Sequence, residues 1–382
     1  MGPSLIIELV RDIFKTKDFI PLHAPFFIGK EQAYVSETIE STFVSSVGEF
    51  VNRFERDFSD YTKGNHATAT VNGTAALHLA LHVAGAKRGD FVITQAATFV
   101  ATCNAIAYTG AEPVFVDVSR QSLGLCPNAL SDYLDMNAVL DDNGLCIDKQ
   151  TRRRYHSVIP MHTFGHPVQL DEILSVCKKW NLILVEDSAE SLGSKYKGKH
   201  TGTIGDFGAF SFNGNKIITT GGGGMLLSRH EENGKRAKHL STTAKIPHKY
   251  DFIHDEVGFN YRMPNLNAAL GCAQLETLDL FISKKRELAL QYEAFFKDTD
   301  FIFVKEPSYA ESNYWLNAII CESSETKQQL LTELNDAGIM SRPLWGLMHK
   351  LPIHRNNKRG ELHNSEWLEQ RLINIPSSPP LS

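Results

Sequence analysis

The central part of the chain alternates between short apolar runs and stretches in which apolar residues recur at helical spacing. Residues 182–185 are apolar at every position, which is typical of a strand buried on both faces of a parallel sheet. Residues 74–84 and 170–180 show helical spacing instead. Further strands are expected at 90–94, 113–118, 157–161, 209–212 and 224–228. This alternation predicts an α/β fold in which helices cover an open, mainly parallel sheet.

The pattern changes after about Pro264. A long helix is expected from about 267 to 296, and shorter strand and helix signals follow at 315–321 and 327–336. A chain of 382 residues is long enough for more than one domain. We therefore expect an N-terminal segment and a large domain over residues 1–264. A linking helix and a small α+β domain are expected over residues 265–382.

Composition and charge narrow the classes of function. The formal net charge of −5 leaves no basic field for nucleic acid or an anionic membrane, and no apolar run is long enough to span a bilayer. The first residues, 4–14, predict a short amphipathic helix and not a secretory signal. Cysteines and histidines show no metal-ligand spacing, and the six scattered cysteines fit reduced thiols in the cytosol. We expect a cytoplasmic protein without a metal that acts on a small molecule.

A turn followed by a helix at residues 72–77 can bind a phosphate. Asn72, Gly73 and Thr74 open the apolar helix, and the amides in the first turn of a helix have no partner within it. Those amides and the Thr74 hydroxyl can hold an anion. Alternatively, Thr74 is an ordinary helix cap that binds no ligand.

Acidic residues follow the apolar run at 182–185. Asp187 is expected at the carboxyl end of that strand, which is the edge where open α/β sheets bind their ligands. An aspartate there can pair with a protonated ring nitrogen. The alternative is a helix cap or a solvated loop acid.

Lys216 lies in a small polar loop between two apolar runs, and four glycines follow at 221–224. Glycine permits backbone angles and close approaches that other residues do not. The segment lacks the strand–GxGxxG–helix context of a dinucleotide site and the Gly-Lys-Ser/Thr ending of a P-loop. Taken alone, a lysine in such a loop is usually a solvated charge.

The three motifs together indicate a site for pyridoxal phosphate. They supply a helix start for the phosphate, an aspartate after a buried strand, and a Ser-x-x-x-x-Lys loop. Lys216 would form the Schiff base, and Asp187 would keep the pyridine nitrogen protonated so that the ring withdraws electrons. Phe99 follows a strand and can lie flat on that ring. The alternative for Phe99 is an ordinary core aromatic.

With these motifs the sequence resembles the sugar aminotransferases of the DegT/DnrJ/EryC1/StrS family, from about Pro21 to Ser378. The resemblance rests on residues 72–77, 98–102, 186–190, 211–216 and 258–263. It implies the fold type I architecture of pyridoxal-phosphate enzymes, which is like that of aspartate aminotransferase, and a homodimer with shared active sites. Lys216 is not a histidine, which argues against the dehydratase offshoot of this family.

The same resemblance implies a role for each matching residue. Lys216 matches the lysine that carries the cofactor, and Asp187 matches its partner at the pyridine nitrogen. Phe99 matches the aromatic that stacks on the ring. Glu190 matches a position near the cofactor's phenolic oxygen, where an acid resembles the perosamine-synthase branch. The residues that match phosphate contacts are Gly73, Thr74, Ala75, Ser211 and, from the neighbouring subunit, Asn260.

A finer resemblance, to LegC-type aminotransferases of legionaminic acid biosynthesis, rests on residues 23–27, 42–48, 161–167 and 312–317. It implies a nucleotide-linked 2-acetamido-2,6-dideoxy 4-keto hexose as acceptor and L-glutamate as donor, for surface-glycan biosynthesis. The alternatives are a perosamine-type or other keto-sugar aminotransferase, and a non-catalytic protein that binds the cofactor and senses a ligand. Candidate sugar or nucleotide contacts, each of which can also be a core, loop or surface residue, are His23, Phe26, His162, Asn313, Trp315 and Arg342.

Overall fold

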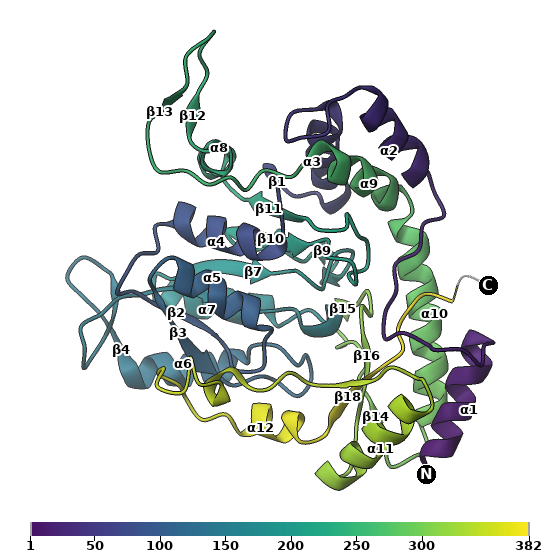
Figure 1. Cartoon of the computed structure of the whole chain (residues 1–382). Coiled ribbons are helices and arrows are strands. Elements are labelled where there is room, and N and C mark those ends of the chain that lie inside the picture. The colour runs from purple at the N-terminus through teal and green to yellow at the C-terminus, as the bar shows by residue number, and fades with distance from the viewer. Residues whose placement is uncertain (1, 381–382) are drawn as a thin grey trace.

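The structure is a computed structural model that describes residues 2–380, and it is built around a central sheet of seven strands (Figure 1). All neighbours from β10 to β3 are parallel, whereas β11 runs antiparallel to both β10 and β1. The predicted α/β class and mainly parallel sheet are confirmed. In spatial order the strands are β1 (Ala67–Thr70), β11 (Gly224–Ser228), β10 (Phe207–Ser211), β7 (Ile183–Asp187), β6 (Tyr155–Ile159), β2 (Phe91–Gln95) and β3 (Glu112–Val116).

Alternate residues of the strands face opposite layers of helices. Val92 of β2 packs in one layer with α4 (Gly73–Ala84), α5 (Val100–Tyr108) and α8 (Glu231–Ser241). Phe91 and Ile93 pack on the other face with α6 (Pro127–Asn137) and α7 (Leu170–Lys179). Every residue of β2 is buried as a result, which explains why the strands appear in the sequence as continuous apolar runs.

A second, antiparallel sheet forms from the C-terminal part of the chain. Its strands, in spatial order, are β14 (Ile302–Phe303), β16 (Asn317–Ile320), β18 (Leu372–Ile375) and β17 (Arg342–Pro343). Helix α1 (Pro3–Phe14), which the sequence predicted, lies beside α11 (Ser324–Asp336), and its Ile6 and Val10 share a core cluster with residues of this sheet (Figure 1). The N-terminal helix therefore shares a core with the C-terminal elements, and the division of the chain at 264/265 stays a proposal.

The long helix predicted at about 267–296 is two helices. They are α9 (Asn265–Glu276) and α10 (Leu278–Phe296), and Thr277 separates them with φ −108° and ψ 0°. The amide and the hydroxyl of Thr277 both donate to the carbonyl of Gln274, at 3.2 and 3.1 Å. The expectation of one continuous helix is wrong at this residue, because the chain closes the last turn of α9 on itself.

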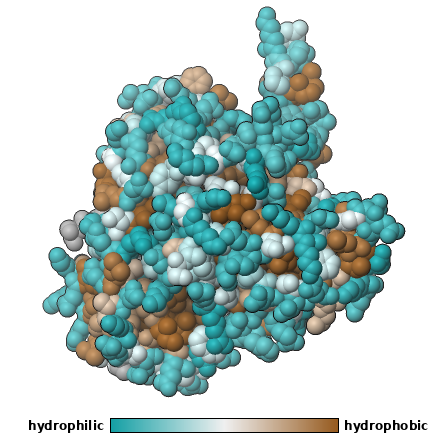
Figure 2. All heavy atoms as spheres, turned by 180° about the vertical axis from the view of Figure 1, so that it is seen from behind, coloured by the Kyte–Doolittle hydropathy of each residue, from teal (hydrophilic) through white to brown (hydrophobic). Residues whose placement is uncertain are grey.

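The remaining elements are short or lie at the edges of the molecule. The helices are α2 (Glu31–Glu40), α3 (Glu49–Thr62), α11 (Ser324–Asp336) and α12 (His363–Glu369), with 3-10 turns at Thr163–Gly165 and Met348–Lys350. The strands are β4 (Ala138–Leu140), β5 (Cys146–Asp148), β8 (Lys195–Tyr196), β9 (Lys199–His200), β12 (Lys245–Ile246), β13 (Ile253–His254) and β15 (Ala310–Glu311). The β12–β13 hairpin stands out from the body of the molecule (Figures 1 and 2). Within residues 2–380 no helix is long and apolar enough to cross a membrane.

Candidate active site

A cavity of about 370 Å³ lies at the carboxyl ends of β7 and β10, beside the first turn of α4. Its volume is in the usual range for small-molecule sites, and this edge of the sheet is where open α/β sheets bind ligands. The charged side chains that line it are Asp187, Glu190 and Lys216. The sequence-predicted residues that it brings together are Gly73, Thr74, Phe99, Asp187, Glu190, Ser211, Lys216 and Trp315.

One end of the cavity is formed by backbone amides in the first turn of α4 and by the hydroxyl group of Ser211. Asn72 caps α4, and its Oδ1 accepts a hydrogen bond from the Ala75 amide at 2.7 Å. The amides of Gly73 and Thr74 come earlier in the turn and have no partner within the helix. A Cβ atom added to Gly73 would lie 2.8 Å from the Cβ of Ser211, so glycine allows the close approach of α4 to this serine. These neutral donors at a helix start fit a phosphate group, although Asn72 already engages the predicted Ala75 amide.

Asp187, the last residue of β7, is a buried carboxyl group that lines the cavity. Its Oδ2 accepts a hydrogen bond from the Thr102 hydroxyl at 2.7 Å, and its Oδ1 accepts one from the Ala189 amide at 3.2 Å. Burial raises the pKa of Asp187, and these hydrogen bonds and the charge of Lys216 oppose the rise. A buried carboxylate oriented by neutral groups fits a ligand that brings its own positive charge, as a protonated pyridine nitrogen does.

Lys216 reaches from the loop after β10 to a position between an acid and an aromatic ring. Its Nζ lies 3.3 Å from Oε1 of Glu190 and 3.8 Å from the centroid of the Trp315 ring. The other oxygen of Glu190, Oε2, accepts a hydrogen bond from the Phe164 amide at 2.9 Å. Burial raises the pKa of Glu190, while the charge of Lys216 and the Phe164 amide oppose the rise. A partly desolvated amine inside such a cavity is suited to bond covalently with an aldehyde cofactor.

Trp315 is held in place through each of its polar groups. Its indole N–H donates to the Asn215 carbonyl at 2.7 Å, and its amide donates to Oδ1 of Asn313 at 2.8 Å. Its carbonyl accepts a hydrogen bond from Nζ of Lys285 at 3.1 Å. Lys285 is fully buried in α10, and burial holds the pKa of its amine well below the usual value. Trp315 therefore presents only its ring to the cavity.

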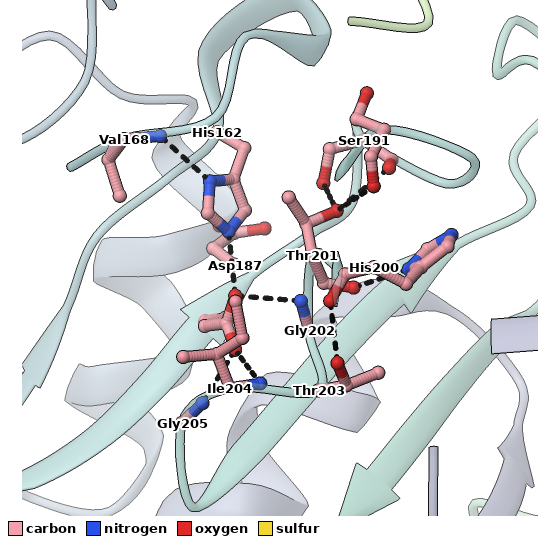
Figure 3. A network of polar contacts seen from close by, with 12 residues as sticks. His162, Val168, Asp187, Ser191, His200, Thr201, Gly202, Thr203, Ile204 and Gly205 are labelled. Atoms are coloured by element: carbon pink, nitrogen blue, oxygen red, sulfur yellow. Dashed lines mark hydrogen bonds and ion pairs between the residues drawn. The ribbon is translucent and has the colours of Figure 1, made fainter. Parts of the chain in front are cut away.

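His162, a predicted sugar contact, is buried and does not line the cavity. Its Nδ1 accepts a hydrogen bond from the Val168 amide at 3.2 Å (Figure 3). Its Nε2 lies 3.0 Å from Oε2 of Glu186. Glu186 also accepts from three backbone amides in the 202–205 loop, at 2.7 to 2.8 Å. Burial raises the pKa of Glu186, but the hydrogen bonds from His162 and the amides outweigh burial and lower it. Both ring nitrogens of His162 are engaged inside the protein, so neither is left for a sugar.

Asn313 likewise has its side chain engaged within the protein and does not line the cavity. Its Nδ2 donates to the carbonyls of Glu190 at 3.0 Å and Leu192 at 2.9 Å, while its Oδ1 accepts from the Trp315 amide. Asn313 thus ties together Glu190 and Trp315, the two residues on either side of the Lys216 amine. In this structure it supports the site and makes no contact within the cavity.

Two predicted contacts lie on the surface, away from the cavity. Arg342 is exposed on the short strand β17, where its guanidinium donates to the carbonyl of Ser341 at 3.4 Å. Asn260 is also exposed and forms an isolated bridge with Thr242 near the β12–β13 hairpin. The roles of Arg342 toward a diphosphate and of Asn260 toward a partner's phosphate stay predictions.

The N-terminal segment places two further predicted contacts near the site without lining the cavity. Burial and the charges of Lys285 and Lys216 hold the pKa of His23 well below its ordinary value, so this imidazole is neutral. The ring of Phe26 packs against the large core cluster, and its carbonyl accepts from Nε2 of Gln274 at 2.8 Å. Their roles in nucleotide binding stay predictions.

Thr102 and Trp345 belong to the site and were not predicted from the sequence. Thr102, in the first turn of α5, holds Asp187, and its position just after Phe99 is the signal that could have identified it. Trp345 lines the cavity from the loop after β17. Its ring lies 5.2 Å from that of Phe164 and 6.2 Å from that of Phe99, measured between centroids.

Comparisons with known proteins identify the family of this chain. The sequence profile of the DegT/DnrJ/EryC1/StrS aminotransferase family matches residues 27–382. The chain is 38% identical over 364 residues to GDP-perosamine synthase from Escherichia coli O157:H7, covering 95% of this chain and 94% of that protein. It is 35% identical to GDP-perosamine synthase from Vibrio cholerae, covering 95% of each chain.

Two solved structures with the same fold are aminotransferases. TlmJ from Streptoalloteichus hindustanus superposes with a TM-score of 0.86 at 26% identity, covering 95% of each chain. A DegT DnrJ EryC1 StrS aminotransferase from Brucella abortus superposes with a TM-score of 0.84 at 26% identity, covering 92% of this chain and 91% of that one. The fold predicted from the resemblance, that of fold type I pyridoxal-phosphate aminotransferases, is confirmed.

Proposed function

This chain belongs to the DegT/DnrJ/EryC1/StrS family and is a pyridoxal-phosphate-dependent sugar aminotransferase, and we propose that it moves the amino group of L-glutamate to C4 of a nucleotide-linked 4-keto-6-deoxy hexose. The observation that carries the assignment of the site is the position of the Lys216 amine, 3.3 Å from Glu190 in the cavity that Asp187 also lines. We further propose that the protein works in the cytoplasm.

Each charged residue of the cavity has a distinct task in this proposal. When bound, pyridoxal phosphate supplies a ring that withdraws electrons from the carbon that loses a proton. Asp187 keeps the ring nitrogen protonated, because a buried carboxylate without water is stabilised by that positive charge. Lys216 would hold the cofactor through its Nζ, and the same amine, when free, would take the proton from the α-carbon of the donor. Glu190 accepts a hydrogen bond from the released amine and keeps it at the site.

For the acceptor, the relatives favour a GDP-linked 4-keto-6-deoxy hexose. Two similar proteins, 38% and 35% identical over nearly the whole chain, are GDP-perosamine synthases. The alternative acceptor, a nucleotide-linked 2-acetamido sugar of the legionaminic acid type, rested partly on the stretches 161–167 and 312–317. Within those stretches, His162 and Asn313 have side chains that bond to other parts of the protein. Their presence therefore supports the fold and says little about the sugar.

The phosphate end of the cavity supports a homodimer with shared sites. Gly73, Thr74 and Ser211 offer only neutral donors at this end, and a further neutral donor, such as the Asn260 amide of a second copy, would add to them. Asn260 lies near the exposed arm formed by the β12–β13 hairpin, on which Tyr250 and Phe252 are 75% and 80% exposed (Figure 2). We propose that a second copy covers the arm and that Asn260 reaches its phosphate.

Mixed dimers test the shared site directly. In a dimer of one Lys216→Ala chain and one Asn260→Ala chain, one of the two sites keeps both residues. We expect the mixture to recover activity that neither variant has alone. If Asn260 acted within its own chain, the mixture would be as inactive as the two variants.

A labelled donor tests the proposed reaction. The protein is incubated with pyridoxal phosphate, 15N-glutamate and a panel of GDP-, UDP- and dTDP-linked 4-keto-6-deoxy sugars, with and without a 2-acetamido group. We expect 15N at C4 of the sugar, fastest with the GDP-linked sugar that lacks the acetamido group. Label in no sugar of the panel, while the protein still takes the amino group from glutamate, would overturn the acceptor class.

A further inference from the structure

Trp345 lines the cavity together with Lys216 and Glu190. Its ring packs 5.2 Å from that of Phe164, whose amide holds Glu190, and the other oxygen of Glu190 faces the Lys216 amine. On its other side the ring lies 6.2 Å from that of Phe99. A substrate that reacts at Lys216 therefore shares the cavity with the indole of Trp345.

The aromatic side chains that line the cavity, Trp315, Phe99 and Trp345, form a wall of mostly apolar surface. Trp315 has its indole N–H bonded to the Asn215 carbonyl and is 4% exposed, so it contributes a ring face. Phe99 is 49% exposed and contributes another. The indole N–H of Trp345 has no hydrogen-bond partner anywhere in residues 2–380. This wall therefore suits a ligand that presents C–H groups to the rings and one oxygen atom to the indole N–H of Trp345.

The loop that carries Trp345 is fixed on both sides. The Leu344 amide donates to the Leu372 carbonyl of β18 at 3.4 Å, and the Met348 amide donates to the Ala96 carbonyl after β2 at 3.0 Å. The Leu347 amide donates to Oε1 of Glu369 at 3.2 Å. A side chain anchored in this way is pre-organised, and a pre-organised wall can discriminate between ligands at little entropic cost.

We propose that Trp345 determines specificity for the 6-deoxy edge of the acceptor sugar. This inference rests on the proposed function. The indole face packs against the C5–C6 edge, where a 6-deoxy sugar has a methyl group. The indole N–H donates to an oxygen of the same sugar. A 6-hydroxyl against this face would lose its water without a partner to replace it, which disfavours 6-hydroxy sugars.

The test separates the two half-reactions in Trp345→Phe and Trp345→Ala. Amino transfer from glutamate to the cofactor is followed first by the loss of the cofactor's visible absorbance. We expect both variants to lose less in this step than in the acceptor step, because glutamate presents no sugar edge to the indole. Trp367→Phe, a change of the same side chain in α12 outside the cavity, is the matched control.

The acceptor step is then measured with a 4-keto-6-deoxy sugar and its 6-hydroxy counterpart on the same nucleotide. We expect Trp345→Ala to lower kcat/KM for the 6-deoxy sugar by about 30-fold or more and to bring the two sugars within about threefold of each other. Trp345→Phe keeps a ring face and should keep most of the preference, with a loss of about tenfold or less from the missing N–H.

Either of two results would overturn the role of Trp345 while leaving the proposed function intact. One is an unchanged preference for the 6-deoxy sugar in Trp345→Ala, and the other is an equal loss in both half-reactions, which a merely structural role would cause. If instead the unaltered protein converts no 4-keto sugar, the proposed function fails, and the assignment of Trp345 fails with it.

Discussion

The Nζ atom of Lys216 lies 3.3 Å from Oε1 of Glu190, and only 12% and 2% of the two side chains is exposed. Because burial raises the pKa of Glu190, its carboxyl group binds a proton more readily in the folded protein than in the unfolded chain. The ionised form is therefore a cost to the folded state, which the charge of Lys216 offsets in part. The ionised carboxylate of Glu190 therefore serves the site through its position beside the Lys216 amine and does not stabilise the folded state.

The first prediction concerns the pH dependence of stability. For a carboxyl group with a raised folded pKa, the free energy of unfolding falls as pH rises from its unfolded pKa, about 4.3, toward the folded value. Glu190→Gln removes this titration and keeps the shape. We expect the free energy of unfolding of Glu190→Gln to rise relative to that of the unaltered cofactor-free protein as pH increases through this window, by up to about 1.4 kcal/mol per pH unit. Urea unfolding over a pH series measures this, with exposed Glu311→Gln as control; parallel curves for Glu190→Gln would refute it.

The second prediction ranks two residues around the ring nitrogen. Asp187→Asn replaces a carboxylate with a neutral amide that cannot stabilise a protonated nitrogen, and we expect amino transfer to fall by about 100-fold or more. Thr102→Val removes one hydrogen bond to Asp187 and should cost about tenfold or less. Rates are compared at saturating cofactor. A loss in Thr102→Val as large as that in Asp187→Asn would contradict the assigned roles.

The third prediction concerns the network around Glu186. Glu186→Ala leaves His162 and three buried amides without their acceptor, and breaking such a buried network should cost about 3–5 kcal/mol. The lowered pKa of Glu186 means that its contribution is complete above the unfolded pKa and is lost as pH falls. Urea unfolding at neutral pH measures the cost.

An exposed ion pair provides the control for this third prediction. Lys195 and Glu311 lie 3.3 Å apart with exposed side chains, so Glu311→Ala should change stability by about 0.5 kcal/mol or less. Similar losses in the two variants would mean that the network around Glu186 is not the buried support described above.

The fold was predictable where local pattern and tertiary environment agree. Strand β7 is buried on both faces, and the sequence is accordingly an unbroken apolar run from 182 to 185, before the acids Glu186 and Asp187 that end the strand. Strand β1, Ala67–Thr70, is equally part of the sheet, but its alternating alanine and threonine give no apolar run. The break at Thr277 was also missed, because apolar residues continue at helical spacing on both sides of it.

The site was predictable where the chemistry depends on residue type within a short motif. Lys216 and Asp187 fall into this class, since each closes or follows a strand that delivers it to the cavity. His162 was predicted to be a pocket residue because a polar side chain interrupts an apolar pattern there. In the structure its ring is hydrogen-bonded to the buried carboxylate of Glu186. Trp345 gave no local signal, because its position depends on how the distant loop is anchored on β18 and near Ala96.

The central claim is that Lys216 carries the cofactor of this aminotransferase, and covalent mapping tests it most directly. The protein is loaded with pyridoxal phosphate, reduced with borohydride, digested and analysed by peptide mass spectrometry. We expect the pyridoxyl group on Lys216 alone, and we expect Lys216→Ala to carry no pyridoxyl group and to show no amino transfer. A pyridoxyl group on another lysine, such as the buried Lys285, with amino transfer retained in Lys216→Ala, would contradict the account.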